Sequence, residues 1–190
     1  MKNITFETYY INPFYEDNDD EYINCVNYVN CRDDKEFQIY NELYYSYSGY
    51  VPGTINFCID EKIFSKPIET VNLHMTWRSY TYLLKREENF KKFYIAYDCP
   101  GAETYFEKHP TEKMLRFVYN DQKTEYFSVE AIKQAIVKGF MEFMSHTNRD
   151  VESLKYMDQE DDDEITEEIL EANEIYEKML SDSKKGKPLY

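Results

Sequence analysis

The chain has 190 residues, a formal net charge of −15 and four cysteines. This length suits one ordinary domain with an extension, since domains usually run to about 100 to 150 residues. No stretch approaches the roughly 18 to 20 uninterrupted apolar residues of a membrane span. The polar N-terminal stretch MKNITFETYYINP does not have the apolar core of a signal peptide. We therefore expect a cytoplasmic protein.

Residues 3–127 have the composition of a β-sheet. They are rich in tyrosine, phenylalanine, isoleucine, valine and threonine, in short runs separated by polar clusters such as EDNDDE and CRDDKE. We predict strands at 3–11, 22–31, 36–48, 53–60, 70–77, 91–98 and 113–127. The last of these folds as a hairpin through the turn sequence YNDQK.

The prediction for 70–77 rests on strict alternation of apolar and polar residues. In TVNLHMTW, Val71, Leu73, Met75 and Trp77 fall on one face of a strand. The sequence that follows, RSYTYLLKREE, is also compatible with a helix, so the choice between strand and helix stays open over 70–88.

The spacing of apolar residues changes after Phe127 from two to three and four. Ile132, Ile136, Phe140 and Phe143 then share one face of a predicted helix over 129–146, and Ser128 is placed to cap its first turn. We expect this face to pack on the sheet and those four side chains to be buried.

A second helix is predicted at 163–181, in a strongly acidic part of the chain. Residues 158–182 hold 12 acidic residues and 1 basic residue, and the last eight residues, SKKGKPLY, form a short basic tip. The predicted fold class is therefore α+β: a mainly antiparallel sheet with one packed amphipathic helix and an acidic C-terminal helix. We expect a core domain over 1–147 and an extension over 148–190.

The sequence offers little material for catalysis. The most enzyme-like stretch is YDCPGAETYFEKHP, in which Cys99 precedes His109 by ten residues. A cysteine nucleophile needs a nearby base and a lowered pKa, whereas the acidic residues Asp98, Glu103 and Glu107 would raise the pKa of this thiol. An enzyme using Cys99 and His109 is the least favoured of our three hypotheses.

The motifs of cofactor and metal sites are also missing. None of the three histidines has a cysteine or a second histidine at metal-ligand spacing. The acidic run at 17–21 resembles the start of a calcium loop, but Tyr22 and Tyr28 stand where the loop needs glycine and glutamate. The chain has no glycine-rich phosphate loop. We therefore predict no cofactor, no metal and reduced, partly buried cysteines.

Acidic and tyrosine-rich segments are the remaining candidates for function. Carboxylates spaced along a helix or loop can imitate the phosphates of a nucleic acid, although acidic runs are also common as solvated linkers. A strand over 37–47 would leave tyrosines on its outer face, where they serve either as anchors at an interface or as cross-strand packing partners. The predicted partner-binding residues are Asp17, Asp19, Asp20, Glu21, Asp161, Asp162, Asp163 and Glu164, with Tyr40, Tyr44 and Tyr50 as aromatic anchors.

In overall character the chain resembles small acidic inhibitors of bacteria and phages, such as anti-CRISPR, anti-restriction and immunity proteins. The leading hypothesis is an inhibitor that occupies a basic site on a nuclease or another nucleic-acid-handling protein. Direct nucleic-acid binding is disfavoured because the negative charge repels phosphates. The first alternative is a structural or assembly module that docks through its C-terminal helix on a partner or on a second copy.

Overall fold

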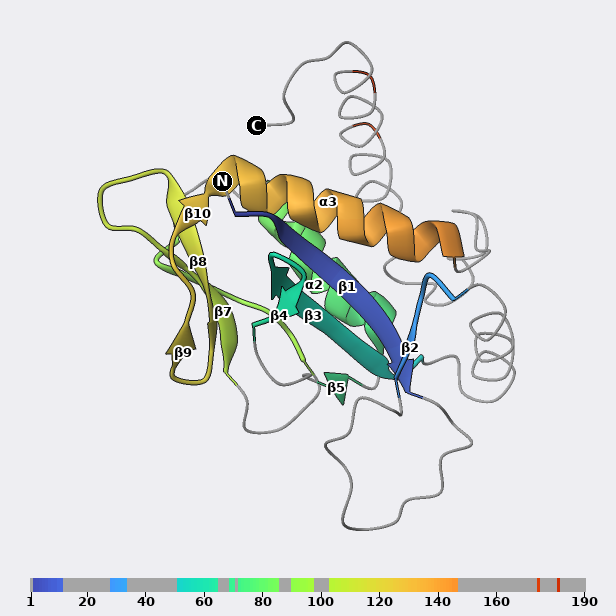
Figure 1. Cartoon of the computed structure of the whole chain (residues 1–190). Coiled ribbons are helices and arrows are strands. Elements are labelled where there is room, and N and C mark those ends of the chain that lie inside the picture. The colour runs from blue at the N-terminus through green and yellow to red at the C-terminus, as the bar shows by residue number, and fades with distance from the viewer. Residues whose placement is uncertain are drawn as a thin grey trace, which may run out of the picture.

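The computed structural model describes residues 2–11, 28–33, 51–64, 69–70, 72–85, 90–97 and 103–146, together with Glu174 and Ser181. In this part of the chain, antiparallel strands form two sheets (Figure 1). Helix α3 packs against strands of both sheets, and helix α2 packs against α3 and β3. The predicted α+β class is confirmed. The strand predicted at 36–48 lies outside the described residues, and so does the 163–181 helix except for Glu174 and Ser181, whose backbone is helical.

The first sheet has the strand order β2-β1-β3-β4, and β5 pairs with β3. Its strands are β1 Ile4–Ile11, β2 Tyr28–Asn30, β3 Gly53–Ile59, β4 Lys62–Ile63 and β5 Glu69–Thr70. The strands predicted at 3–11 and 53–60 are confirmed, and β2 lies within the one predicted at 22–31. Burial alternates strictly along β1, so one face of this strand is turned to the core and the other is half-buried, whereas β3 is buried on both faces up to Cys58.

The second sheet has the strand order β10-β8-β7-β6, and β9 pairs with β8. Its strands are β6 Lys92–Tyr94, β7 Thr104–Lys108, β8 Met114–Tyr119, β9 Gln122–Lys123 and β10 Phe127–Ser128. The hairpin predicted over 113–127 is confirmed by β8 and β9, with Asn120 in the turn at a φ of 51°. Strand β7 was not predicted, although it pairs with both β6 and β8.

The strand predicted at 70–77 is wrong beyond Thr70, because helix α2 spans Leu73–Lys85. Asn72 caps this helix: its Oδ1 accepts a hydrogen bond from the backbone N–H of His74 at 3.1 Å. Leu73 and Trp77 are fully buried, as the alternation required, but Met75 between them is 47% exposed. The helical spacing of Leu73, Trp77 and Tyr80 therefore decides the structure.

Helix α3, Val129–His146, has the predicted bounds. The Ser128 hydroxyl accepts a hydrogen bond from the backbone N–H of Ala131 at 3.1 Å, which confirms the predicted cap. The four apolar residues expected in the core are all buried. Gly139 faces β1 at close range, since a Cβ atom at this position would lie 2.9 Å from the carbonyl oxygen of Phe6.

One aromatic core joins the two sheets and both helices. Phe57 of β3 stacks on Phe117 of β8 with ring centroids 4.9 Å apart. Trp77 of α2 packs against Phe140 of α3, with centroids 5.9 Å apart, and donates an indole hydrogen bond to the Thr8 hydroxyl of β1 at 3.0 Å. The described part of 1–147 is therefore held together by shared burial, while the boundary at 147 remains a prediction.

Candidate functional site

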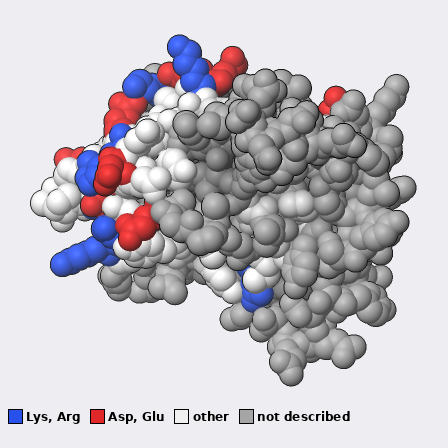
Figure 2. Space-filling model, turned by 90° about the horizontal axis from the view of Figure 1, so that it is seen from below, with Lys and Arg blue, Asp and Glu red and all other residues white. Residues whose placement is uncertain are grey.

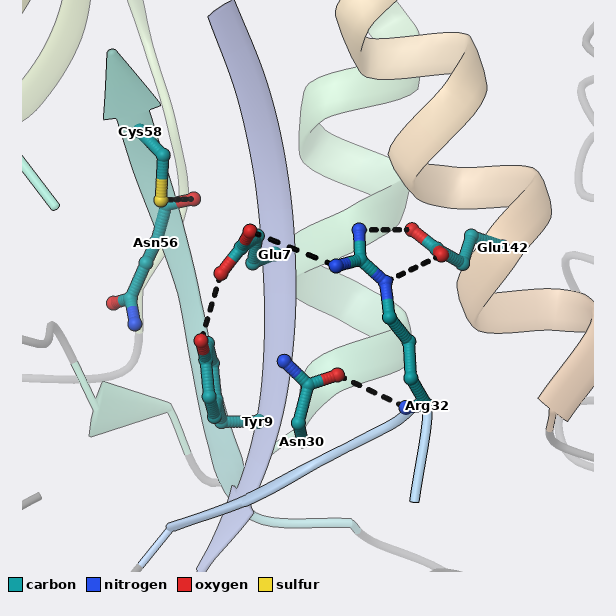
Figure 3. Close-up of polar contacts among 7 residues, drawn as sticks. All are labelled: Glu7, Tyr9, Asn30, Arg32, Asn56, Cys58 and Glu142. Carbon is teal, nitrogen blue, oxygen red and sulfur yellow. Dashed lines mark hydrogen bonds and ion pairs between the residues drawn. The ribbon is translucent and has the colours of Figure 1, made fainter. Parts of the chain in front are cut away.

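A polar cluster lies on the face of the first sheet that is turned away from the aromatic core (Figure 3). Strand pairing brings its side chains together, since Glu7 of β1 is paired with Asn56 of β3, and Tyr9 of β1 is paired with Asn30 of β2. The remaining members of the cluster are Arg32, Cys58 and Glu142.

Arg32 connects this face of the sheet to helix α3. Its Nε and Nη2 atoms donate hydrogen bonds of 2.6 Å and 3.0 Å to the two carboxylate oxygens of Glu142, in the planar two-point geometry that favours arginine. Its Nη1 atom lies 3.8 Å from a carboxylate oxygen of Glu7. The hydrogen bond to Glu142 raises the pKa of Arg32 above its ordinary value, so the guanidinium stays charged. Arg32 thus ties the segment after β2 to a helix 110 positions later.

Glu7 is shared between Arg32 and Tyr9. The Tyr9 hydroxyl donates a hydrogen bond of 2.7 Å to the second carboxylate oxygen of Glu7. Burial, together with this hydrogen bond to a carboxylate, raises the pKa of Tyr9 to about 12. The phenol therefore remains protonated at neutral pH and acts as a donor.

Cys58 is fully buried within the cluster, and its thiol faces the backbone carbonyl of Asn56 at 3.8 Å. Burial, and then the negative charge of Glu7, raises the pKa of Cys58 to about 12. Cys31 is also buried, and burial together with the charge of Glu142 raises its pKa to about 12. A thiol with such a pKa is a poor nucleophile, because the thiolate is the reactive form. Both are free thiols, as predicted for the cysteines.

The cluster is therefore better suited to holding the fold than to catalysis. It joins strand β1, the segment after β2 and helix α3 through a guanidinium, two carboxylates and a phenol. Sequence reasoning did not find it, because Arg32 and Glu142 carry no local motif and are far apart in the chain. The only sequence signal was the alternation of polar residues along β1.

His109, the predicted partner of Cys99, has a local role in the structure. Its Nδ1 atom accepts a hydrogen bond from the backbone N–H of Glu112 at 3.2 Å, within the turn between β7 and β8. Its ring packs edge-on against Tyr126, with centroids 4.7 Å apart. Cys99 lies outside the described residues, and so do all eleven predicted partner-binding residues, from Asp17 to Glu164.

Within the described ranges, no group of three histidine, cysteine, aspartate or glutamate side chains is arranged to hold a metal ion. Neither α2 nor α3 is long and apolar enough to cross a membrane. In comparisons with known proteins, no family model, curated protein or solved structure matches the chain.

Proposed function

We propose that this protein is a small inhibitor that presents carboxylates to a basic site on a nuclease or another nucleic-acid-handling protein. The observation that carries the proposal is the distribution of charge. The described residues between Lys2 and His146 contain 13 lysines and arginines and 12 aspartates and glutamates. The net charge of −15 therefore comes from the remaining segments of the chain, chiefly those that contain the two acidic runs.

The described surface carries both signs of charge. Figure 2 shows lysine and arginine interspersed with aspartate and glutamate at the side of the molecule that holds the second sheet. A balanced scaffold with concentrated acidic segments favours recognition through those segments, because charges act on a partner over roughly one Debye length, about 8 Å in physiological salt. Carboxylates in such runs can occupy the positions that phosphates take in a basic groove.

Both thiols and one histidine of the described part are engaged in the fold, which supports a binding role over catalysis. The thiols of Cys31 and Cys58 are buried, and the Nδ1 atom of His109 accepts a backbone hydrogen bond in a turn. An enzyme would instead need an accessible nucleophile with a base in reach.

The test starts with affinity capture from a bacterial lysate, comparing the intact chain with one that ends at Tyr156. A captured basic protein then enters kinetic measurements with two variants. One neutralises Asp17, Asp19, Asp20 and Glu21, and the other neutralises Asp161, Asp162, Asp163 and Glu164. We expect slower association in both variants and a steep loss of rate with salt, since charges at the rim of an interface act mainly on encounter.

A control variant makes the same change of charge on the scaffold, at four exposed acidic residues of the described part: Asp33→Asn, Glu61→Gln, Glu103→Gln and Glu112→Gln. This control should retain the association rate of the intact chain. If all three variants capture the same partner at the same rate across a salt series, the acidic runs only keep the protein soluble and the inhibitor proposal is wrong.

Tyrosine anchors are expected to act on dissociation instead. Replacing Tyr40, Tyr44 or Tyr50 by alanine should raise the off-rate where the side chain is a true anchor, with a loss of about 2 kcal/mol or more. Unchanged off-rates in all three variants would show that these tyrosines do not anchor the partner.

A further inference from the structure

The outer face of the second sheet carries three cations around one carboxylate. The strand register places Lys92 of β6, Glu107 of β7 and Arg116 of β8 side by side. Arg116 donates a hydrogen bond of 2.6 Å from Nε to Glu107, and the Nζ atom of Lys123 lies 3.7 Å from the same oxygen. Burial raises the pKa of Glu107, but Arg116, Lys123 and Lys92 together lower it below its ordinary value. The carboxylate therefore stays charged and is shared among three positive groups.

Tyrosines lie among these cations. Lys92 places its Nζ atom 4.2 Å from the centroid of the Tyr105 ring, and Tyr94 packs against the same ring with centroids 5.2 Å apart. Tyr94 is 55% exposed, the largest exposed fraction among the large apolar and aromatic side chains of the described residues. Glu103 adds a weaker attraction to Lys92. The face thus combines an excess of positive charge with an accessible aromatic ring.

Lys92 and Tyr94 belong to the edge strand β6. At both ends of β6, odd-numbered residues form the hydrogen bonds toward β7. The Ile95 N–H donates to the carbonyl oxygen of Thr104, and the carbonyl oxygen of Lys91 accepts from the Lys108 N–H. The backbone groups of Lys92 and Tyr94 therefore point away from β7, and no strand of the described part pairs with that side. Just beyond Tyr94, the Ala96 N–H donates to the Ser79 hydroxyl of α2.

We propose that the edge of β6 and the adjoining outer face of the second sheet bind an extended acidic peptide segment of a partner protein as an added strand. An edge that offers alternating N–H and C=O groups complements a peptide backbone, which a nucleic acid does not supply. The charge of −15 also repels a polyphosphate more strongly than a peptide with a few carboxylates. Edge lysines deter apolar strands, so Lys92 selects for an acidic one.

The surface also specifies a pattern for the bound segment. Lys92 and Tyr94 project from the same face of β6, so the residues opposite them on an added strand are also two positions apart. We expect a carboxylate opposite Lys92 and an aromatic or branched side chain opposite Tyr94, since such cross-strand pairs stabilise a sheet. This surface binds an acidic partner, whereas the acidic runs are proposed to bind a basic one, so the inference stands whether or not the proposed function is correct.

The experiment uses the full chain and a fluorescently labelled peptide of the repeat glutamate–threonine–tyrosine–threonine, in which glutamate and tyrosine alternate on one face of an extended strand. Binding is followed by fluorescence anisotropy. We expect saturable binding that weakens with salt. Charge reversal at Lys92→Glu and Lys123→Glu together should raise Kd roughly tenfold, as two attractions become repulsions. The control is Lys62→Glu, which reverses an exposed lysine on β4, the edge strand of the first sheet, and should leave Kd unchanged.

Two further probes separate strand addition from other modes of binding. The same peptide N-methylated at alternate residues cannot donate along one edge, and should bind at least about fivefold more weakly. The same repeat with lysine in place of glutamate should bind the double variant better than the intact chain. The proposal is overturned if the acidic peptide does not bind at about 1 mM, if N-methylation leaves Kd unchanged, or if oligothymidylate binds this face more tightly than the peptide.

Discussion

Replacing Gly139 by alanine tests whether helix propensity or tertiary packing has the larger effect on the stability of the protein at this position. Gly139 lies inside the 18-residue helix α3. In a helix interior, alanine is favoured over glycine by about 1 kcal/mol, because glycine loses more conformational freedom on folding. The sequence alone therefore predicts that Gly139→Ala stabilises the protein.

The structure predicts the opposite sign. An added Cβ atom would lie 2.8 Å from Cη2 of Trp77 and 2.9 Å from both Cβ and the carbonyl oxygen of Phe6, whereas ordinary contact begins at 3.4 Å. Trp77 is fully buried and held by its hydrogen bond to Thr8, and the oxygen of Phe6 belongs to the backbone of β1. Neither neighbour has a flexible end that could move aside. Helix α3 must therefore shift away from β1.

Overpacking of this kind typically costs about 1–3 kcal/mol of unfolding free energy. Because both neighbours are immobile, we expect the overpacking in Gly139→Ala to cost about 3 kcal/mol. Subtracting about 1 kcal/mol for helix propensity leaves a net loss of about 2 kcal/mol. The assay is urea unfolding followed by circular dichroism, with the exposed neighbour Lys138→Ala as control, expected within about 0.5 kcal/mol of the unmodified protein. A higher unfolding midpoint for Gly139→Ala than for the unmodified chain would refute the described contact between α3 and β1.

Other substitutions test the core, the cap and the thiols. Phe140→Ala should lose about 3–5 kcal/mol of unfolding free energy, because the ring is buried against Trp77; an unchanged thermal midpoint would contradict this packing. Ser128→Ala should lose about 1 kcal/mol in urea unfolding through the lost cap, whereas Ser128→Asp should retain most of it. Cys31 and Cys58 should resist alkylation at pH 8 in the folded protein and react on unfolding, because burial raises both pKa values to about 12; site-resolved mass spectrometry measures this, and rapid labelling of either native thiol would disprove its burial.

Much of the secondary structure is encoded in local patterns. The bounds of α3 follow from the spacing of Ile132, Ile136, Phe140 and Phe143 and from the cap at Ser128, because a long periodic segment with a capping residue has few competing structures. The strands β1 and β3 and the hairpin of β8 and β9 follow from apolar runs that end in polar turns.

Helix α2 shows where local patterns become ambiguous. Leu73 and Trp77 fit both the alternation of a strand and the spacing of a helix, since a separation of four residues satisfies both periods. Met75 would be buried in the strand and is exposed in the helix. The cap at Asn72 and the burial of Tyr80 against Phe6 select the helix, and the second of these requires the sheet to be in place.

Residue types and local patterns were sufficient to predict the fold class, the free thiols of Cys31 and Cys58 and the uneven charge, because these depend on the sequence and on near neighbours. Contacts between distant segments follow from the assembled fold alone: Arg32 meets Glu142 across 110 positions, and the glycine at 139 is needed because a strand from the start of the chain passes beside it. The three cations around Glu107 likewise become neighbours through strand register, which depends on how β6, β7 and β8 align. These contacts form when the burial of apolar surface brings separate elements together, so they cannot be predicted from residues that are close in the sequence.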